Sequence, residues 1–132
     1  MILVDTNVIV DVLSADPRWS GWSIARLIEA RAADRLCINL IVYAELCTDP
    51  STAAVVDRFL ADNKIADVPM TTDMGRRAAA AFRTYRQRKG VKTGVLPDFF
   101  IGAHAQSEGC TLLTRDAARY RTYFKGVKLI CP

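Results

Sequence analysis

Zinc ligands are scarce in this sequence of 132 residues. It contains one histidine, His104, and four cysteines, none of which forms a CxxC pair with another. A structural zinc site needs about four such ligands, usually in closely spaced pairs, so the common zinc-binding modules are excluded. We expect the cysteines to be reduced thiols, because three of them lie inside short apolar runs.

Long apolar runs and low-complexity segments are also absent. No window approaches the roughly 18 uncharged apolar residues of a membrane-spanning helix. The opening residues have no basic segment, and Asp5 interrupts their apolar stretch at once, so we expect no signal peptide. With 51% hydrophobic residues but only seven glycines and five prolines, the composition predicts one globular domain over residues 1–132, located in the cytoplasm.

Negative charge is missing from one long stretch of the chain. The net charge is only +4, but residues 1–73 carry 11 acidic and 6 basic groups, whereas residues 74–97 carry seven basic groups and no acid. Such a segment is commonly a solvated helix face, and it is also the pattern that contacts a nucleic-acid backbone. The net charge alone does not explain this segregation of acids from bases.

Short apolar runs alternate with longer segments of helical periodicity. The runs predict five strands, at Ile2–Val4, Leu36–Ile38, Ile65–Val68, Cys110–Leu113 and Val127–Cys131. The segments between them predict helices over residues 6–13, 18–33, 40–47, 51–62, 72–89, 97–108 and 116–123. Because strands separated by helices are joined by crossovers, we expect an α/β fold with a mostly parallel sheet covered on both faces. Residues 90–97 are the expected mobile loop.

Four of the 14 carboxylates stand where solvation does not explain them. Asp5 and Asp116 each follow a predicted strand, at the edge where functional groups gather in parallel sheets. Asp98 begins a predicted helix, and Glu45 is the one acid in an otherwise apolar helix. We expect these four acids to be buried together, with a hard cation such as Mg²⁺ relieving their repulsion.

Each of these acids also has a structural alternative. Asp5, Asp98 and Asp116 could be helix N-caps. Glu45 could pair with an arginine, which would offset the cost of burying its charge. The metal-site hypothesis fails only if the structural alternative is correct for all four acids at once.

The four acids lie in four short motifs, in this order: Met1-Ile-Leu-Val-Asp5-Thr6-Asn7, Tyr43-Ala44-Glu45-Leu46, Pro97-Asp98-Phe99-Phe100-Ile101-Gly102-Ala103 and Leu112-Leu113-Thr114-Arg115-Asp116. Together they resemble the PIN domain, specifically the VapC toxins of type II toxin–antitoxin systems. Each motif is weak alone, but their order and spacing fit the family along the whole chain. The resemblance implies a PIN-like three-layer α/β/α sandwich with a mostly parallel central sheet. Gly102, where the family commonly has alanine, is a minor difference on a packed helix face.

The resemblance also implies the residues of the site. It assigns catalysis and the binding of Mg²⁺ or Mn²⁺ to Asp5, Glu45, Asp98 and Asp116. Asp5 and Asp98 are the strongest ligand candidates, and Glu45 and Asp116 are expected to act partly through metal-bound water. The supporting polar residues that orient carboxylates or water are Asn7 and Thr114.

The function implied by the resemblance is endonucleolytic cleavage of RNA by metal-activated water, with a VapB-like antitoxin as partner and a homodimer as the assembly. A single histidine agrees with this route, because cleavage through the 2′-hydroxyl commonly uses a pair of histidines. The basic residues expected to hold the RNA are Arg76, Arg77, Arg83, Arg86, Arg88, Lys89, Lys92 and Arg115. Arg115, beside Asp116, is the one expected to reach the scissile phosphate. Arg119, Arg121, Lys125 and Lys128 extend a second basic patch around it.

Two other functions remain open. A phosphatase or phosphotransferase could use Asp5 as its nucleophile, but such sites usually have a second aspartate two residues later, where Asn7 stands. A catalytically inactive RNA-binding PIN module is the other alternative, although it would not need four intact acids.

Overall fold

A single sheet of five strands forms the centre of the protein. The structure is a computed structural model and describes residues 1–92 and 94–132. The strands are β1 (Ile2–Val4), β2 (Leu36–Ile38), β3 (Ala66–Asp67), β4 (Thr111–Leu113) and β5 (Leu129–Ile130), in the order β3-β2-β1-β4-β5. All four neighbouring pairs are parallel, which confirms the predicted α/β class. Thr93, inside the predicted mobile loop, lies outside the described residues.

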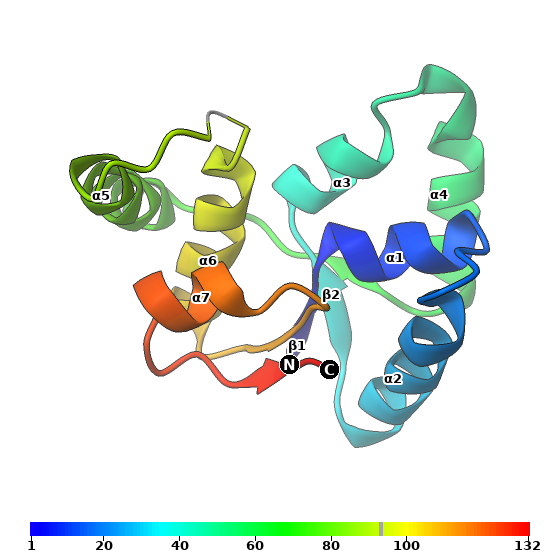
Figure 1. The fold of residues 1–132 in the computed structure, drawn as a ribbon. Helices are drawn as coiled ribbons and strands as arrows, with labels where there is room; N and C mark the ends of the chain where they lie inside the picture. The colour runs from blue at the N-terminus through cyan, green and yellow to red at the C-terminus, as the bar shows by residue number, and fades with distance from the viewer. Residues whose placement is uncertain (93) are drawn as a thin grey trace.

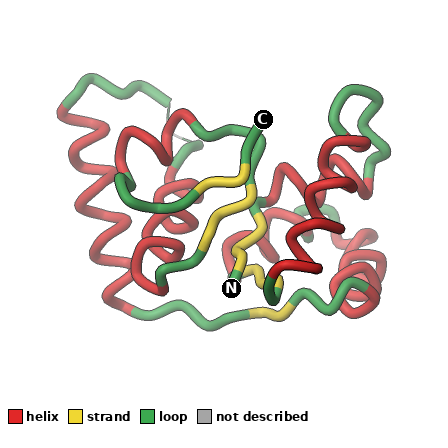
Figure 2. The backbone as a smooth tube through the Cα atoms, turned by 90° about the horizontal axis from the view of Figure 1, so that it is seen from below, coloured by secondary structure: helices red, strands yellow, loops and turns green. Residues whose placement is uncertain are grey.

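Helices flank the sheet on both sides, which confirms the PIN-like α/β/α arrangement. In the described residues they are α1 (Thr6–Leu13), α2 (Ser20–Ala33), α3 (Leu40–Leu46), α4 (Ala53–Asp62), α5 (Thr72–Gln87), α6 (Leu96–Glu108) and α7 (Ala118–Tyr123). Figure 1 shows α1, α2 and α4 on one side and α5, α6 and α7 on the other. Figure 2 shows the strands as a layer between the two groups. Within the described part of the chain, no helix has the length and apolar character needed to cross a membrane.

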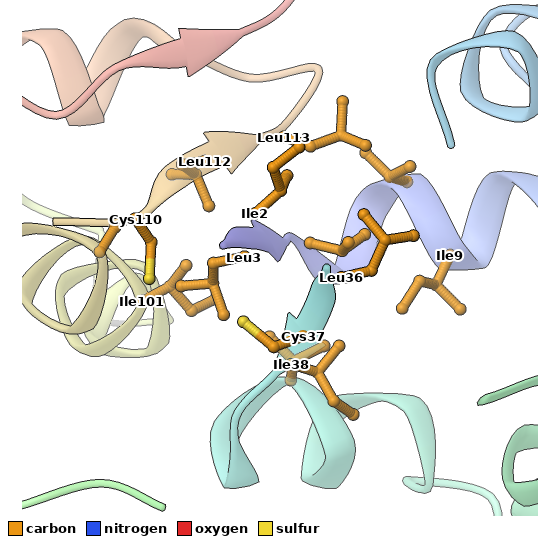
Figure 3. Packing of buried hydrophobic residues seen from close by; sticks show 14 of the residues in the cluster. Ile2, Leu3, Ile9, Leu36, Cys37, Ile38, Ile101, Cys110, Leu112 and Leu113 are labelled. Atoms are coloured by element: carbon orange, nitrogen blue, oxygen red, sulfur yellow. The ribbon is translucent and has the colours of Figure 1, made fainter. Parts of the chain in front are cut away.

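The core is built on the central strands. All three residues of β1 and of β2 are buried, as expected for strands covered on both faces. Leu3 of β1 and Cys37 of β2 pack near Ile101 of α6 and Cys110, as Figure 3 shows. Cys37 and Cys110 are free thiols, and burial raises the pKa of Cys37 to about 12, so this thiol stays protonated.

Several predicted boundaries were wrong by a few residues. The helix predicted from residue 18 begins at Ser20, because Asp16 accepts hydrogen bonds from the backbone of Arg18 and Trp19 and so caps a turn that precedes α2. The helix predicted at residue 116 begins at Ala118, and a 3₁₀ turn at Pro50–Thr52 precedes α4. The edge strands β3 and β5 have two residues each, so they are shorter than the runs predicted at Ile65–Val68 and Val127–Cys131.

The strand order defines where functional groups can gather. From β1 the chain moves to β2 and β3 on one side, and then to β4 and β5 on the other. The strand order therefore reverses between the neighbouring strands β1 and β4, whose register pairs Val4 with Leu113. In open α/β sheets, ligands bind beyond the carboxyl ends of the strands at such a switch point. Asp5 and Thr114 follow these two strand ends directly.

Candidate active site

Asp5 is the buried centre of the site, with 4% of its surface exposed. It is the N-cap residue of α1, as the structural alternative expected, yet its side chain makes no capping hydrogen bond, so capping does not explain the burial of this carboxylate. Its Oδ2 accepts hydrogen bonds from Asn7 Nδ2 at 2.9 Å, Thr114 Oγ1 at 2.6 Å and Tyr120 OH at 3.2 Å. Three donors from different elements therefore hold this carboxylate through one of its two oxygens.

Thr114 and Asn7 join the end of β4 to α1. Asn7 donates to Thr114 Oγ1 at 3.2 Å and accepts a hydrogen bond from the Arg115 backbone at 3.2 Å. The backbone N–H of Asp116 donates to Thr114 Oγ1 at 3.1 Å. These contacts fit the predicted role of Asn7 and Thr114 as residues that orient the acids.

Asp98 lies beside Asp5 at the start of α6. It is the third residue of the helix, whose N-cap is Val95, so Asp98 is not an N-cap. Its Oδ2 accepts a charge-assisted hydrogen bond from Arg119 Nη1. Burial raises the pKa of Asp98, the Arg119 guanidinium opposes that rise, and the charges of Glu45 and Asp116 add to it.

The other two acids complete the rim of the site. Glu45 on α3 is half-buried and accepts a hydrogen bond from Thr6 Oγ1, with no arginine pair found in the described residues. Asp116 is exposed and precedes Ala117, the N-cap of α7, so it is not an N-cap either. The prediction that all four acids are buried is therefore wrong. Asp116 is exposed and Glu45 is only half-buried.

The donor set fits a magnesium site with few direct ligands. Within residues 1–92 and 94–132, no three Asp, Glu, His or Cys side chains are grouped closely enough to hold one metal ion. Mg²⁺ usually takes one or two protein carboxylates and keeps several waters. Asp5 and Asp98 fit this habit, because they contact adjacent residues of α7: Tyr120 donates to Asp5 and Arg119 donates to Asp98.

The basic residues predicted to hold RNA lie on the surface. The exposed ones are Arg76, Arg77, Arg83, Arg86, Arg88, Lys89 and Lys92, on α5 and the segment that leads toward α6. Arg115 is different, because its Nε pairs with the buried Asp11 at 3.0 Å and its guanidinium lies 5.5 Å from the centre of the Trp19 ring. In the structure, Arg115 is therefore committed to a structural ion pair.

Sequence reasoning missed Tyr120 and Arg119 as partners of the two central acids. Tyr120 is 2% exposed, and burial beside Asp5 raises the pKa of its hydroxyl, which stays protonated as a donor. For Arg119, the sequence predicts only a place in a basic patch. Both residues lie on α7, a helix whose short, mixed sequence has no periodic signal that would show which side chains face the acids.

A family model for the PIN domain matches residues 2–125 of the chain. The chain belongs to the PIN domain family. Among curated proteins, none matches this chain closely enough to count as a relative. This PIN domain is similar in fold to solved structures of VapBC2 from Rickettsia felis bound to a promoter DNA fragment (TM-score 0.77, 18% identity, 100% of this chain and 99% of that chain covered). It is also similar to FitAcB from Neisseria gonorrhoeae (TM-score 0.67, 24% identity, 98% and 96% covered).

The buried Asp5 predicts a pH dependence of stability in protein freed of metal with chelator. Burial and the neighbouring Asp98 raise the pKa of Asp5 from 3.8 to about 6, although its hydrogen bonds oppose the rise. A carboxyl whose pKa is higher in the folded state contributes stability below its unfolded pKa and loses it as the pH rises through the folded value. The wild type should therefore lose up to about 3 kcal/mol between about pH 4 and pH 7 relative to Asp5→Asn.

Urea denaturation at a series of pH values measures this difference, because each curve yields a free energy of unfolding. Asp5→Asn is the control, since asparagine cannot ionise and all other titrating groups are shared. A difference between the two proteins that does not change with pH would contradict the assignment.

Proposed function

We propose that this protein is a metal-dependent endoribonuclease and the toxin of a VapBC-like toxin–antitoxin pair. The observation that carries the proposal is that Asp5 and Asp98 meet at the switch point of the sheet, where adjacent residues of α7, Tyr120 and Arg119, donate to them. Glu45 and Asp116 lie at the rim of this site. PIN domains are generally nucleases that use divalent metal ions, and a solved structure of similar fold is a toxin–antitoxin complex from Klebsiella pneumoniae (TM-score 0.64, 23% identity).

The chain's own residues would prepare the site for catalysis. Asp5 and Asp98 would hold Mg²⁺ or Mn²⁺ directly, and Glu45 and Asp116 would act through water. The bound metal lowers the pKa of water and stabilises charge that develops on the phosphate. Asn7, Thr114 and Tyr120 keep Asp5 ionised and in place, because hydrogen bonds to a carboxylate favour its charged form.

A cleavage assay with alternative substrates tests the proposal. Purified protein is incubated with single-stranded RNA, the same sequence as DNA, or a phosphomonoester, each with Mg²⁺, with Mn²⁺ or with chelator. We expect metal-dependent cleavage of the RNA that leaves 5′-phosphate ends. Turnover of the phosphomonoester alone would favour the phosphatase, and RNA binding without cleavage would favour the inactive module.

The basic face of α5 predicts salt-dependent RNA binding. Arg83 and Arg86 are exposed, and no acid lies within residues 74–97 to neutralise them. The double variant Arg83→Gln/Arg86→Gln should bind single-stranded RNA more weakly. It should also reduce the slope of log K against log salt by about 1.4 units, because each phosphate contact contributes about 0.7 on a single strand. Filter binding or fluorescence anisotropy in chelator, which prevents cleavage, measures both quantities.

The matched control for this prediction is Arg31→Gln/Arg58→Gln. It removes the same charge from exposed positions on α2 and α4, on the other side of the sheet. An equal change in slope for the two double variants would show that net charge, and not the α5 face, determines RNA binding.

An apolar groove between α2 and α4 of this protein is a suitable binding surface for the proposed antitoxin. The groove is lined mainly by apolar side chains, including Ile24, Leu27, Ile28 and Phe59. Ile28 is 66% exposed and Ile24 is 44% exposed, which is unusual for adjacent turns of one helix. We propose that an amphipathic helix of the antitoxin fills this groove, and that the toxin is a homodimer.

Co-expression with the neighbouring reading frame tests the antitoxin proposal. Copurification with the wild type should be lost with Ile28→Glu, because a charge would be buried in the interface. Glu29→Gln, an exposed change one position later, is the control and should copurify normally. Light scattering of the purified protein tests the homodimer.

A further inference from the structure

Arg119 is the one cation that forms an ion pair with an acid of the site in the described residues. Its Nη1 donates to Asp98 Oδ2, and its side chain is 19% exposed. The guanidinium also lies 6.0 Å from the centre of the Tyr85 ring. Arg119 is therefore held between an acid of the site on α6 and an aromatic face on α5.

This contact singles out Asp98 among the four acids. Asp98 is the only one of them with an ion pair in the described part of the chain. Asp5 relies on neutral donors from Asn7, Thr114 and Tyr120, and Glu45 relies on the hydroxyl of Thr6. The cation thus occupies an oxygen of a carboxylate that the proposed function assigns to the metal.

The positive charges of an arginine and a divalent ion held on one carboxylate repel each other. Each relieves the repulsion between Asp98 and its acidic neighbours, so binding one lowers the benefit of binding the other. The Tyr85 face offers the guanidinium a place to remain after it leaves Asp98, because arginine stacks favourably on aromatic rings.

We propose that Arg119 is a counter-ion that the divalent metal displaces from Asp98, so that this ion pair sets the metal concentration at which the site fills. The inference rests on the proposed metal-dependent function. Arg119 acts through Asp98 and is a positioning residue.

Metal binding, measured apart from catalysis, tests this role. Mn²⁺ is titrated into chelator-treated protein at pH 8, and free Mn²⁺ is followed by electron paramagnetic resonance. Arg119→Gln should bind Mn²⁺ about five- to tenfold more tightly than wild type, because the competing charge is gone. Arg119→Lys, which keeps the charge, should stay close to wild type.

The matched control is Arg121→Gln, on the same helix. Arg121 is exposed, and its Nη2 contacts Cys131 Sγ at 3.1 Å instead of an acid of the site. It should bind Mn²⁺ as wild type does. An equal gain in Arg121→Gln would mean that net charge alone controls the affinity, and would overturn the proposal.

A measurement on the wild type makes the test independent of whether a variant folds. The Nε–Hε signal of Arg119, assigned through its loss in Arg119→Lys, should shift during a titration with Mg²⁺ in nuclear magnetic resonance spectra. An unmoved signal at saturating Mg²⁺, or unchanged affinity in Arg119→Gln, would overturn the proposal while metal-dependent RNA cleavage by the wild type persists. If the wild type neither binds Mn²⁺ nor cleaves RNA, the proposed function fails and this inference falls with it.

Discussion

Asp5→Asn is expected to reduce metal-dependent RNA cleavage at least about a hundredfold, because a metal ligand contributes several kcal/mol to the transition state. Asparagine has nearly the same shape and can still accept the hydrogen bonds of Asn7, Thr114 and Tyr120. What is lost is the negative charge that holds the cation. The fold should therefore survive while the activity disappears.

Initial rates of RNA cleavage at saturating Mg²⁺ measure this effect, together with a free energy of unfolding at the same pH. Asp67→Asn is the matched control, because Asp67 lies exposed on the edge strand β3. It should cleave RNA as wild type does. Cleavage at the wild-type rate by Asp5→Asn would rule out Asp5 as a metal ligand, whatever its effect on stability.

Gly102→Ala is expected to destabilise the protein by about 1–3 kcal/mol, the usual cost of overpacking a core. A methyl group at position 102 would stand 2.3 Å from Cδ2 of Phe124, whose side chain is 2% exposed. Gly102 is itself buried on α6, so neither partner has free space to move into. From the sequence, glycine in place of the family's usual alanine is only a minor difference. In the structure, the ring of Phe124 occupies the space that an alanine side chain at position 102 would fill.

Gly75→Ala on α5 is the matched control for this prediction. A methyl group there would meet nothing within 4 Å. It should stabilise the protein by about 0.5–1 kcal/mol, because alanine favours helix more than glycine. Phe124→Leu replaces the ring with a smaller side chain. In a double-mutant cycle, Gly102→Ala should therefore lower the free energy of unfolding less in the Phe124→Leu background than in the wild type. Equal stability changes in Gly75→Ala and Gly102→Ala would contradict a steric role for Gly102.

Local patterns in the sequence predicted the elements and their order well. The apolar runs at Ile2–Val4 and Leu36–Ile38 are the strands β1 and β2, and the helix predicted over residues 6–13 is α1. These signals are strong because buried strands and amphipathic helices impose a period on neighbouring residues. Boundaries at α2 and α7 were less accurate, because capping and turns depend on contacts that the period does not contain.

The four acids could be selected from the sequence because each interrupts an apolar context or follows a strand. Their environments could not be predicted in the same way. Asp5 is buried and Asp116 is exposed, although both follow central strands. Burial depends on which distant side chains cover a residue, and Tyr120 covers Asp5 from 115 positions away in the sequence.

The sequence by itself therefore determined the alternation of strands and helices, the parallel sheet that follows from it, and the identity of the acids. Only the tertiary structure decided which charges meet. It paired Arg115 with Asp11 and Arg119 with Asp98, although both arginines lie in one basic segment. The reason is physical: an ion pair depends on a few ångströms of separation between side chains on different elements, and that distance is set only when the helices pack against the sheet.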